Sequence, residues 1–440
     1  MVAPLTVGIA GLGTVGAETV RLIEAQAQSL ASRCGRGVRV VAVTARSKAK
    51  RRGLDLTGIR WAQDPLKLAG DPAIECFVEL MGGEGDPALS AIEAALKSGK
   101  SVVTANKALI AKHGLRLAKL AEQHGGALNF EAAVGAAIPV IKTLREGLAG
   151  TEINRVYGIL NGTCNYILTR MEQEGLSFAE CLKDAQRLGY AEANPSFDVD
   201  GHDTAQKLAI LASLAFGTQV AQRSVYVEGI SSIAPEDLRA AEELGYRVKL
   251  LGVAVRTKTG IEQRVHPTMV PKSSSIAQVM GVTNAVTIDG VGISPITLVG
   301  PGAGGAATAS AVVADIADVA RGICAKPFGR PVAKLRPTEK APMQRHEGGY
   351  YIRLMARDLT GTAATIATRL AERGISIESI VQRHPERNSE QKISTRTSSP
   401  VPVILITYAT TEDAVRGALQ AVQRDKVISG RPQVIRIEKN

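Results

Sequence analysis

The residues best suited to chemistry stand in the stretch DVDGHDTAQK, residues 198–207, directly before the apolar run LAILASLAF. Asp203 and Lys207 are four positions apart, so a helix would place them on one face, one turn apart. A lysine held by a carboxylate can donate a proton to a carbonyl oxygen. An ordinary surface salt bridge has the same spacing, so the pair alone favours neither interpretation.

The aspartates of this stretch do not fit a calcium loop. The glycine comes too early, and Ala209 rather than a glutamate stands at the twelfth position from Asp198. We expect Asp198 or Asp200 to cap or line the entrance of the following helix.

Cysteine chemistry is disfavoured. The five cysteines include no CxxC pair, which argues against a disulfide framework or structural zinc site and favours a reducing cytoplasm. Among them only Cys164, in NGTCNY, is a candidate nucleophile by its setting, and a small buried side chain is the simpler interpretation. Cys and His are not grouped as catalytic zinc ligands either. Lys107 and Lys207 remain as candidate proton donors.

A glycine-rich turn, GLGTVG, follows an apolar run and precedes a helical pattern over residues 17–33. In this context G-x-G-x-x-G is typical of a dinucleotide site, although an ordinary tight turn is the alternative. Gly11 permits the turn, Gly13 lets the backbone approach a pyrophosphate, and Gly16 permits close helix–strand packing. The helix N-terminus offers free amides to the anion. The candidate cofactor ligands here are Gly11, Gly13, Thr14, Val15 and Gly16.

The second predicted strand ends in VTARSKAKRR, without the acid that usually binds the ribose of NAD. Arg46 stands where that acid is expected, with Lys48 and Lys50 nearby. Such a cluster can pair with a 2′-phosphate, so NADP is favoured, with NAD as the alternative. A solvated basic loop is the alternative, and it is plausible for Arg51 and Arg52.

Composition indicates an α/β protein of about three domains in 440 residues. The chain is 45% apolar and 3% aromatic, which suits closely packed layers and argues against a stacking platform for nucleic acid. Its net charge of +11 favours anionic ligands. We see no signal-peptide pattern and no apolar segment long enough to cross a membrane.

Strand–helix alternation over residues 1–130 predicts a parallel sheet of the Rossmann type. Residues 131–330 are predicted to form an α+β catalytic and dimerisation domain, from which a helix at 305–325 returns to the first domain. Residues 331–348 are rich in proline and charge, as in a linker. Residues 349–440 show a ferredoxin-like βαββαβ pattern, with the polar loop PERNSEQKISTRTSSP between the middle strands.

Six segments resemble the homoserine dehydrogenase family in type and order. They are GLGTVG, VVTANKALIA, FEAAVGAAIPVI, GILNGTCNYILTRM, LGYAEANPSFDVDGHDTAQKLAILA and GPGAGGAATASAVVADI, and they extend from about residue 5 to 325. The resemblance implies reversible, NAD(P)-dependent interconversion of L-homoserine and L-aspartate 4-semialdehyde, on the route to threonine, methionine and isoleucine. No aspartokinase segment precedes the turn, so a monofunctional enzyme is expected.

The resemblance also implies catalytic and substrate-binding roles. Lys207 resembles the proton donor to the aldehyde oxygen, and Asp203 resembles a substrate ligand that can also hold the lysine ammonium. Glu192, in GYAE, resembles the partner of the substrate amino group. Lys107, in TANK, resembles a second active-site lysine that contacts substrate or cofactor.

Three more residues are implied to lie near the cofactor. Thr104 stands at a strand end, where ligands of α/β proteins bind. Gly189 opens the GYAE motif, and Gly304 in GPGAGG is expected to close over the nicotinamide side.

A monovalent cation site is also implied by the match to FEAAVGAAI. Na⁺ or K⁺ would be held by Glu131 and by the backbone carbonyls of Val134, Ala136 and Ile138. Oxygen ligands suit a hard cation of this kind, whose role is expected to be structural. A glycine-alanine turn that joins two domains is the alternative.

The C-terminal unit resembles an ACT domain, a small-ligand regulatory module. Where that module usually has proline and an aliphatic residue around the first glycine, this chain has Thr360 and Thr362. Feedback by L-threonine is one hypothesis, and a purely dimerising module is the other. The resemblance further implies a homodimer, or a tetramer formed through ACT pairing.

Two other functions stay open at this point. One is a related dehydrogenase that acts on another small aldehyde, and the other is a non-catalytic amino-acid sensor built from a Rossmann domain and an ACT unit. The intact GYAE and DGxD motifs argue against the first, and the presence of both candidate lysines argues against the second.

Overall fold

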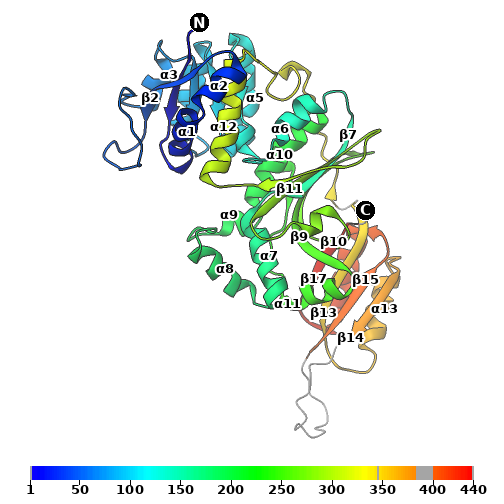
Figure 1. Cartoon of the computed structure of the whole chain (residues 1–440). Coiled ribbons are helices and arrows are strands. Elements are labelled where there is room, and N and C mark those ends of the chain that lie inside the picture. Colours follow the sequence, from blue (N-terminus) through cyan, green and yellow to red (C-terminus); the bar gives the residue numbers. More distant parts are fainter. Residues whose placement is uncertain (1, 344–345, 383–399, 439–440) are drawn as a thin grey trace.

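The computed structural model describes residues 2–343, 346–382 and 400–438. An N-terminal α/β unit, a middle α+β unit and a C-terminal unit follow one another along the molecule (Figure 1). The polar loop that the sequence places at 385–400 lies almost wholly outside the described residues.

The N-terminal unit is built on a six-stranded parallel sheet with the order β3-β2-β1-β4-β5-β6. Its strands are β1 (Leu5–Ala10), β2 (Val38–Thr44), β3 (Arg60–Trp61), β4 (Cys76–Glu79), β5 (Ser101–Thr104) and β6 (Leu128–Asn129). The first strand lies inside the sheet, and the glycine-rich turn leaves its carboxyl end. That is the switch point at which open α/β sheets bind ligands.

The helices of this unit are α1 (Thr14–Ala25), α2 (Ala27–Cys34), α3 (Pro65–Gly70), α4 (Ala88–Lys97), α5 (Lys107–His124) and, from later in the chain, α12 (Gly305–Ala320). One prediction is wrong here, because the helix expected over 17–33 divides at Gln26, which leaves the helical backbone conformation. The bend brings α2 to α12, where the Cys34 thiol lies 3.7 Å from the Ala317 carbonyl.

Helix α12 packs beside α1, although the two helices are far apart in the sequence (Figure 1). Val312 and Ile316 share an apolar cluster with Val7 and Val20 of the N-terminal unit. The two helices meet so closely at Gly305 that an added Cβ would lie 2.7 Å from the Thr14 side chain. The chain therefore returns to the first sheet at 305–320, next to the glycine-rich turn.

The middle and C-terminal units share one eleven-stranded sheet. Its main path is β12-β11-β7-β9-β10-β17-β13-β15-β14, and β8 and β16 pair at its side. The strands of the middle unit are β7 (Ile153–Ile159), β8 (Tyr226–Val227), β9 (Tyr246–Thr257), β10 (Gly260–Pro271), β11 (Thr283–Gly290) and β12 (Ile296–Pro301). Its helices are α6 (Val140–Lys142), α7 (Gly162–Glu174), α8 (Phe178–Arg187), α9 (Ser196–Val199), α10 (His202–Phe216) and α11 (Pro235–Glu243).

The C-terminal unit has the predicted βαββαβ order. Its elements are β13 (Glu347–Ala356), α13 (Thr362–Ala371), β14 (Ile377–Gln382), β15 (Val401–Thr407), β16 (Thr410–Thr411), α14 (Glu412–Arg424) and β17 (Ile428–Ile437). The last strand pairs with β13, and β13 pairs with β15, as in a ferredoxin-like sheet. The predicted α/β fold class is confirmed. The sequence did not reveal the parallel pairing of β10 with β17, which joins the two units.

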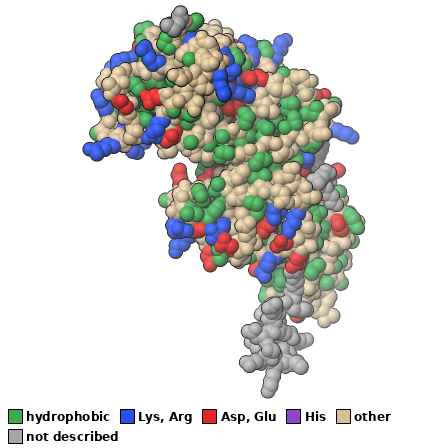
Figure 2. All heavy atoms as spheres, viewed as in Figure 1, with side chains coloured by type: hydrophobic (Ala, Val, Ile, Leu, Met, Phe, Trp, Pro, Cys, Tyr) green, Lys and Arg blue, Asp and Glu red, His purple; other side chains and the backbone are tan. Residues whose placement is uncertain are grey.

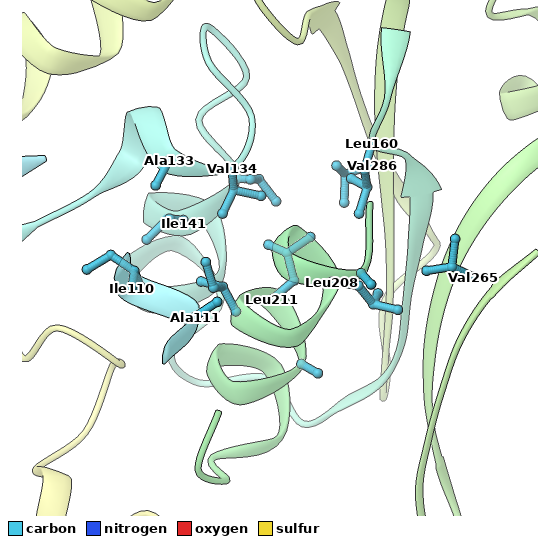
Figure 3. Packing of buried hydrophobic residues seen from close by; sticks show 14 of the residues in the cluster. Ile110, Ala111, Ala133, Val134, Ile141, Leu160, Leu208, Leu211, Val265 and Val286 are labelled. Atoms are coloured by element: carbon cyan, nitrogen blue, oxygen red, sulfur yellow. The ribbon is translucent and has the colours of Figure 1, made fainter. Parts of the chain in front are cut away.

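Helix α10 forms the centre of the middle unit. Every residue from Asp203 to Phe216 is buried. Leu211 lies toward Ile110 and Ala111 of α5, and Leu208 lies toward the sheet (Figure 3). Fully burying one leucine contributes roughly 1.5–3 kcal/mol, so this apolar packing fixes the position of the helix and of the charged residues at its start.

The segment predicted as a linker lies against the middle unit. The Val332 amide donates to the Glu122 carboxylate at 3.1 Å, near the end of α5. Past the end of α10, the Gln219 amide donates to the Arg336 carbonyl at 2.8 Å. The Ile261 amide of β10 donates to the Glu339 carbonyl at 2.8 Å. These hydrogen bonds attach the segment to α5, to the residues after α10 and to β10.

Lys249 of β9 generates a prediction about stability. Its ammonium is 1% exposed and donates to Asn165 Oδ1 at 3.0 Å and to the Val279 carbonyl at 2.6 Å. Burial lowers its pKa from 10.5 to about 7. The folded state therefore binds fewer protons than the unfolded state between these pH values, and stability rises with pH across that range.

We expect the free energy of unfolding of the wild type, measured by urea denaturation, to rise relative to that of Lys249→Met as the pH increases from 7 to 9. The matched control is Lys272→Met, which removes a more exposed lysine paired with Glu242 and should keep a constant difference from wild type. A constant difference for Lys249→Met as well would contradict the lowered pKa.

Candidate active site

A cleft of about 590 Å³ lies between the N-terminal and middle units. Its polar and charged lining residues are Lys107, Asn161, Thr163, Tyr190, Glu192, Asp198, Asp203, Lys207 and Thr308. Val15 of the glycine-rich turn and Gly304 at the start of α12 also line it. Residues that are far apart in sequence, from the glycine-rich turn to the DVDGHDTAQK stretch, therefore meet in one space.

Asp203 binds two lysines at once. Its Oδ2 lies 2.8 Å from Nζ of Lys207, one turn along α10, and its Oδ1 lies 2.9 Å from Nζ of Lys107, at the start of α5. The Asn161 amide also donates to Oδ2 at 2.9 Å. The surface salt bridge weighed above is thus excluded for Asp203 and Lys207, whose side chains are only 5% and 10% exposed.

The charge of Asp203 depends on these partners. Burial alone would raise its pKa, but the ammonium groups of Lys207 and Lys107 outweigh burial and hold the pKa well below its ordinary value. The carboxylate is therefore ionised at neutral pH. Removing one partner from a buried pair typically costs about 3–5 kcal/mol, so the three side chains depend on one another.

Lys207 has one donor left for a ligand. An ammonium carries three N–H groups. Two are directed at Asp203 Oδ2 and at the Leu160 carbonyl, 2.7 Å away. Because Lys207 also lines the cleft, the third can reach an oxygen atom bound there.

Of the two roles expected for Asp198 or Asp200, capping or lining the entrance of the following helix, capping is wrong. The N-cap of α10 is Gly201, at φ 87°, and no side chain caps it. Asp198 belongs to the short helix α9 and lines the cleft, where its Oδ1 accepts a hydrogen bond from Asn161 at 2.8 Å. Gly201, between α9 and α10, allows the sharp turn that brings both Asp198 and Asp203 to Asn161.

The glycine-rich turn has the geometry of a nucleotide site. Gly11 has φ 103°, and an added Cβ would lie 2.4 Å from the Leu80 carbonyl. At Gly16 an added Cβ would lie 2.0 Å from the Gly11 carbonyl, whereas at Gly13 it would meet nothing within 4 Å. Gly13 is also the N-cap of α1 and offers no side-chain cap, so the helix amides are open to an anion.

Arg46 is exposed just after β2, whose end pairs with the end of β1 beside the glycine-rich turn. Figure 2 shows Lys and Arg side chains at the edge of the N-terminal unit where this segment lies. Arg52 is only partly exposed, so the interpretation as a solvated basic loop does not hold for this residue. Its guanidinium donates to the carbonyls of Lys50 and Leu12, at 2.6 and 3.0 Å, and holds the segment against the turn.

Thr104 has a different setting from the other cofactor candidates. Its side chain is fully buried, donates to Glu79 Oε2 at 2.6 Å and accepts from the Asn106 amide at 3.0 Å. Glu79 in turn accepts from the Met81 and Gly82 amides, at 2.7 and 3.0 Å. Thr104 therefore supports the loop after β4 and is not among the residues that line the cleft.

The GYAE motif lies at the mouth of the cleft. Gly189, with φ 76°, and the exposed Glu192 both line it. Tyr190 and Phe197 are each 44% exposed, and the Lys107 ammonium lies 6.0 Å from the Phe197 ring centre. Gly304, at φ 110°, faces open space across the cleft.

The predicted cation loop lies beside the cleft. Both carboxylate oxygens of Glu131 accept backbone amides, from Ile141 at 2.9 Å and from Lys142 at 2.8 Å. Burial and the neighbouring Asp315 raise the Glu131 pKa to about 7. Ala136 has a left-handed backbone, φ 47°, which is uncommon for a residue other than glycine.

A cation fits the charges around this loop. Lys142 pairs with Asp315 at 3.3 Å and also with Asp318, and its charge offsets only part of the effect of burial and Asp315 on Glu131. Among the described residues no group of three or more His, Cys, Asp or Glu side chains could hold a metal. A cation would therefore depend mainly on carbonyl oxygens, and the Ile138 carbonyl already accepts from the Val140 amide at 2.8 Å.

Sequence reasoning missed two features of the site. Asn161 and the Leu160 carbonyl hold Asp203 and Lys207, yet both stand in the quoted motif GILNGTCNY without an assigned role. An asparagine before a predicted helix was the available signal, since it is a preferred N-cap. Cys164 is confirmed as a small buried residue, and burial together with nearby Asp198 raises its thiol pKa well above the usual range.

The chain is similar to known proteins over its whole length. One family model, described as homoserine dehydrogenase, matches residues 139–317, and another, described as the NAD binding domain of homoserine dehydrogenase, matches residues 11–131. The homoserine dehydrogenase of Pseudomonas aeruginosa is 43% identical over 99% of both chains. That of Neisseria gonorrhoeae is 39% identical, also over 99% of both.

Solved structures agree with this similarity. A homoserine dehydrogenase from Thiobacillus denitrificans has a TM-score of 0.91 and 42% identity, and the match covers 99% of this chain and 98% of that one. A hyperthermophilic archaeal homoserine dehydrogenase in complex with NADPH has a TM-score of 0.61 and 27% identity, over 72% of this chain and 97% of the other.

The Rossmann sheet, its open glycine-rich turn and the adjoining polar cleft define an oxidoreductase that uses a nicotinamide cofactor and a small-molecule substrate. The chain belongs to the homoserine dehydrogenase family, and its activity is that of a homoserine dehydrogenase. Neither the sensor nor the dehydrogenase for another aldehyde gains support from these comparisons. Among the described helices we found none with the length and apolar character needed to cross a bilayer.

The glycine-rich turn generates a paired prediction. Gly13→Ala adds a methyl group in open space at φ −74°, so unfolding free energy should stay within about 0.5 kcal/mol while cofactor affinity falls. Gly16→Ala forces a methyl group onto the Gly11 carbonyl and should destabilise by about 1–3 kcal/mol. Thermal unfolding and NADPH fluorescence titration measure both effects. Unchanged NADPH binding in a folded Gly13→Ala variant would contradict this account.

Proposed function

We propose that Lys207 is the proton donor in the reversible reduction of L-aspartate 4-semialdehyde to L-homoserine. Support comes from its position in the cleft, where Asp203 and the Leu160 carbonyl take two N–H groups and leave one for the aldehyde oxygen. When bound, a nicotinamide cofactor would supply the hydride in this direction and accept it in the reverse direction. In the reverse direction Lys207 accepts the proton of the homoserine hydroxyl.

The other charged residues of the cleft are proposed to bind and orient the substrate. Glu192 at the mouth, together with Asp203, is placed to attract its amino group. Lys107 lies at the start of α5 and pairs with Asp203 on the side away from Lys207. At that position its ammonium can contact the substrate or the cofactor and share the charge of Asp203.

Lys207→Gln removes the proton donor and retains much of the side-chain volume. We expect kcat to fall by about 10²–10⁴-fold while NADPH still binds, because general acid catalysis contributes that much. The assay follows NADPH absorbance with L-aspartate 4-semialdehyde. Lys112→Gln is the control, because Lys112 lies on α5 and pairs with Glu84 at the surface. Wild-type kcat in Lys207→Gln would refute the proposed role.

The cofactor is proposed to be NADP. Its pyrophosphate would lie on the glycine-rich turn, with Gly11, Gly13 and Gly16 shaping the backbone and Thr14 and Val15 starting the helix. Arg46 follows β2 without a competing acid and is exposed, as pairing with a 2′-phosphate requires. Gly189 and Gly304 also line the cleft and leave room for the rest of the cofactor, and Thr104 supports the loop after β4 through Glu79.

Arg46→Ala should raise the KM for NADPH by about tenfold, the equivalent of one charge-assisted hydrogen bond, and leave the KM for NADH unchanged. Steady-state rates with both cofactors measure this. The control is Arg51→Ala, a neighbouring exposed arginine. An equal effect of Arg46→Ala on both cofactors would contradict recognition of the 2′-phosphate.

We also propose that Na⁺ or K⁺ occupies the loop formed by Glu131 and the carbonyls of Val134, Ala136 and Ile138. The excess negative charge of two buried carboxylates beside one lysine supports a cation there. The raised pKa of Glu131, about 7, implies that proton and cation compete for this carboxylate near neutral pH.

A homodimer is proposed to form through the side of the middle unit. Strand β12 ends the large sheet, and the exposed side chains of Val291, Ile293 and Val299 lie on or beside it. Figure 2 shows hydrophobic side chains gathered over this part of the molecule. A second copy of the chain would cover both the apolar surface and the strand edge.

For the C-terminal unit the proposal is an ACT-type regulatory module, with L-threonine as its candidate effector. The ferredoxin-like strand order and the shared sheet support a module coupled to the middle unit. A module that only dimerises remains the alternative, since Thr360 and Thr362 depart from the usual first turn.

A further inference from the structure

Asn161 links the two aspartates that face the cleft. It stands where β7 meets α7, is 6% exposed and lines the cleft. Its Nδ2 donates to Asp198 Oδ1 at 2.8 Å and to Asp203 Oδ2 at 2.9 Å. A side-chain amide has two N–H donors, and both are used on these carboxylates.

The side-chain oxygen of Asn161 and the carbonyl of its neighbour Leu160 also accept hydrogen bonds. Asn161 Oδ1 accepts a hydrogen bond from the Cys164 amide at 2.8 Å and so caps α7. The preceding residue, Leu160, holds Lys207 through its carbonyl. Two consecutive residues therefore fix both members of the Asp203–Lys207 pair, one through a backbone carbonyl and the other through a side-chain amide.

Electrostatics explain why an amide is needed at this position. Asp198 and Asp203 carry like charges and converge on one point, which favours protonation or rotation of one of them. Lys207 and Lys107 pair directly with Asp203, whereas the Asp198 carboxylate accepts a side-chain hydrogen bond from Asn161 and, among the described residues, forms no ion pair. Two neutral N–H donors satisfy both carboxylates without adding a charge that would compete for the lysines.

We propose that Asn161 is a positioning residue for proton transfer, which fixes the rotation of the Asp203 carboxylate so that Lys207 keeps one N–H directed into the cleft. The same amide holds Asp198 in the cleft as a hydrogen-bond acceptor. This inference rests on the proposed role of Lys207 and adds the requirement for an N–H donor at position 161.

Two variants separate this role from the helix cap. Asn161→Ser and Asn161→Asp both retain an oxygen that can cap α7, and neither offers the paired N–H donors. We expect both to fold and to bind NADPH as wild type does. For Asn161→Ser, kcat should fall by about tenfold or more, the effect of one lost hydrogen bond to a charged group, with a smaller change in KM.

The pH profile supplies a readout that a purely structural role would not change. Burial raises the pKa of Asp198, whose surroundings also include Asp203, Lys207 and Lys107, with Glu192 on the same cleft. Asn161→Asp adds a third carboxylate at this point and should raise that pKa further. The acid limb of kcat/KM should therefore move to higher pH in Asn161→Asp, and by less in Asn161→Ser.

Wild-type kcat and an unchanged pH profile in both variants would overturn the inference. Lys207→Gln, measured alongside, separates this failure from that of the proposed function. Loss of turnover in Lys207→Gln with active Asn161 variants removes only the role of Asn161. Full activity in Lys207→Gln would remove the proton donor on which the inference rests.

Discussion

The buried carboxylate of Asp203 is the constraint on which the rest of the site depends. Placing a charge away from water is costly, and two ammonium groups and one amide offset that cost here. The three partners come from α5, α10 and the β7–α7 junction. The carboxylate can therefore be stable only when these elements are correctly packed, which couples the charge distribution of the cleft to the fold.

The position of Asp203 is fixed by α10, a largely apolar helix whose first two turns carry Asp203 and Lys207. Helix α10 is buried along its length between α5 and the large sheet, so its position is set by side chains that take no part in chemistry (Figure 3). Helix α5 begins directly after β5, at the carboxyl end of the parallel sheet, which brings Lys107 to the same edge as the glycine-rich turn. Lys107 and the glycine-rich turn lie at one edge because each follows the carboxyl end of a parallel strand.

Much of this could be predicted from local patterns. The strand–helix alternation, the turn GLGTVG and the four-residue spacing of Asp203 and Lys207 are signals within short segments, and the structure bears out their geometry. The second lysine on Asp203 could not be read in this way, because Lys107 is far away in the sequence and only the packing of α5 against α10 brings it there. The pairing of β10 with β17 could not be predicted for the same reason, because the two strands are far apart in the sequence.

The errors have physical causes as well. Asp198 and Asp200 suited a helix cap by residue type, but Gly201 takes a left-handed conformation and turns the chain, so Asp198 is free to bind Asn161. Gln26 carries no helix-breaking signal, so the division of the helix at this residue could not be predicted from the local sequence. Asn161 was overlooked because its partners are distant in sequence, although its capping position was visible.

The central claim, that the pairing with Asp203 leaves Lys207 one donor for the substrate oxygen, is tested most directly by a crystal structure with L-homoserine and oxidised cofactor bound. The account predicts the homoserine hydroxyl oxygen within about 3.2 Å of Lys207 Nζ, with the Asp203 and Leu160 contacts retained. A hydroxyl bound by another side chain, with Lys207 turned away from it, would contradict the account.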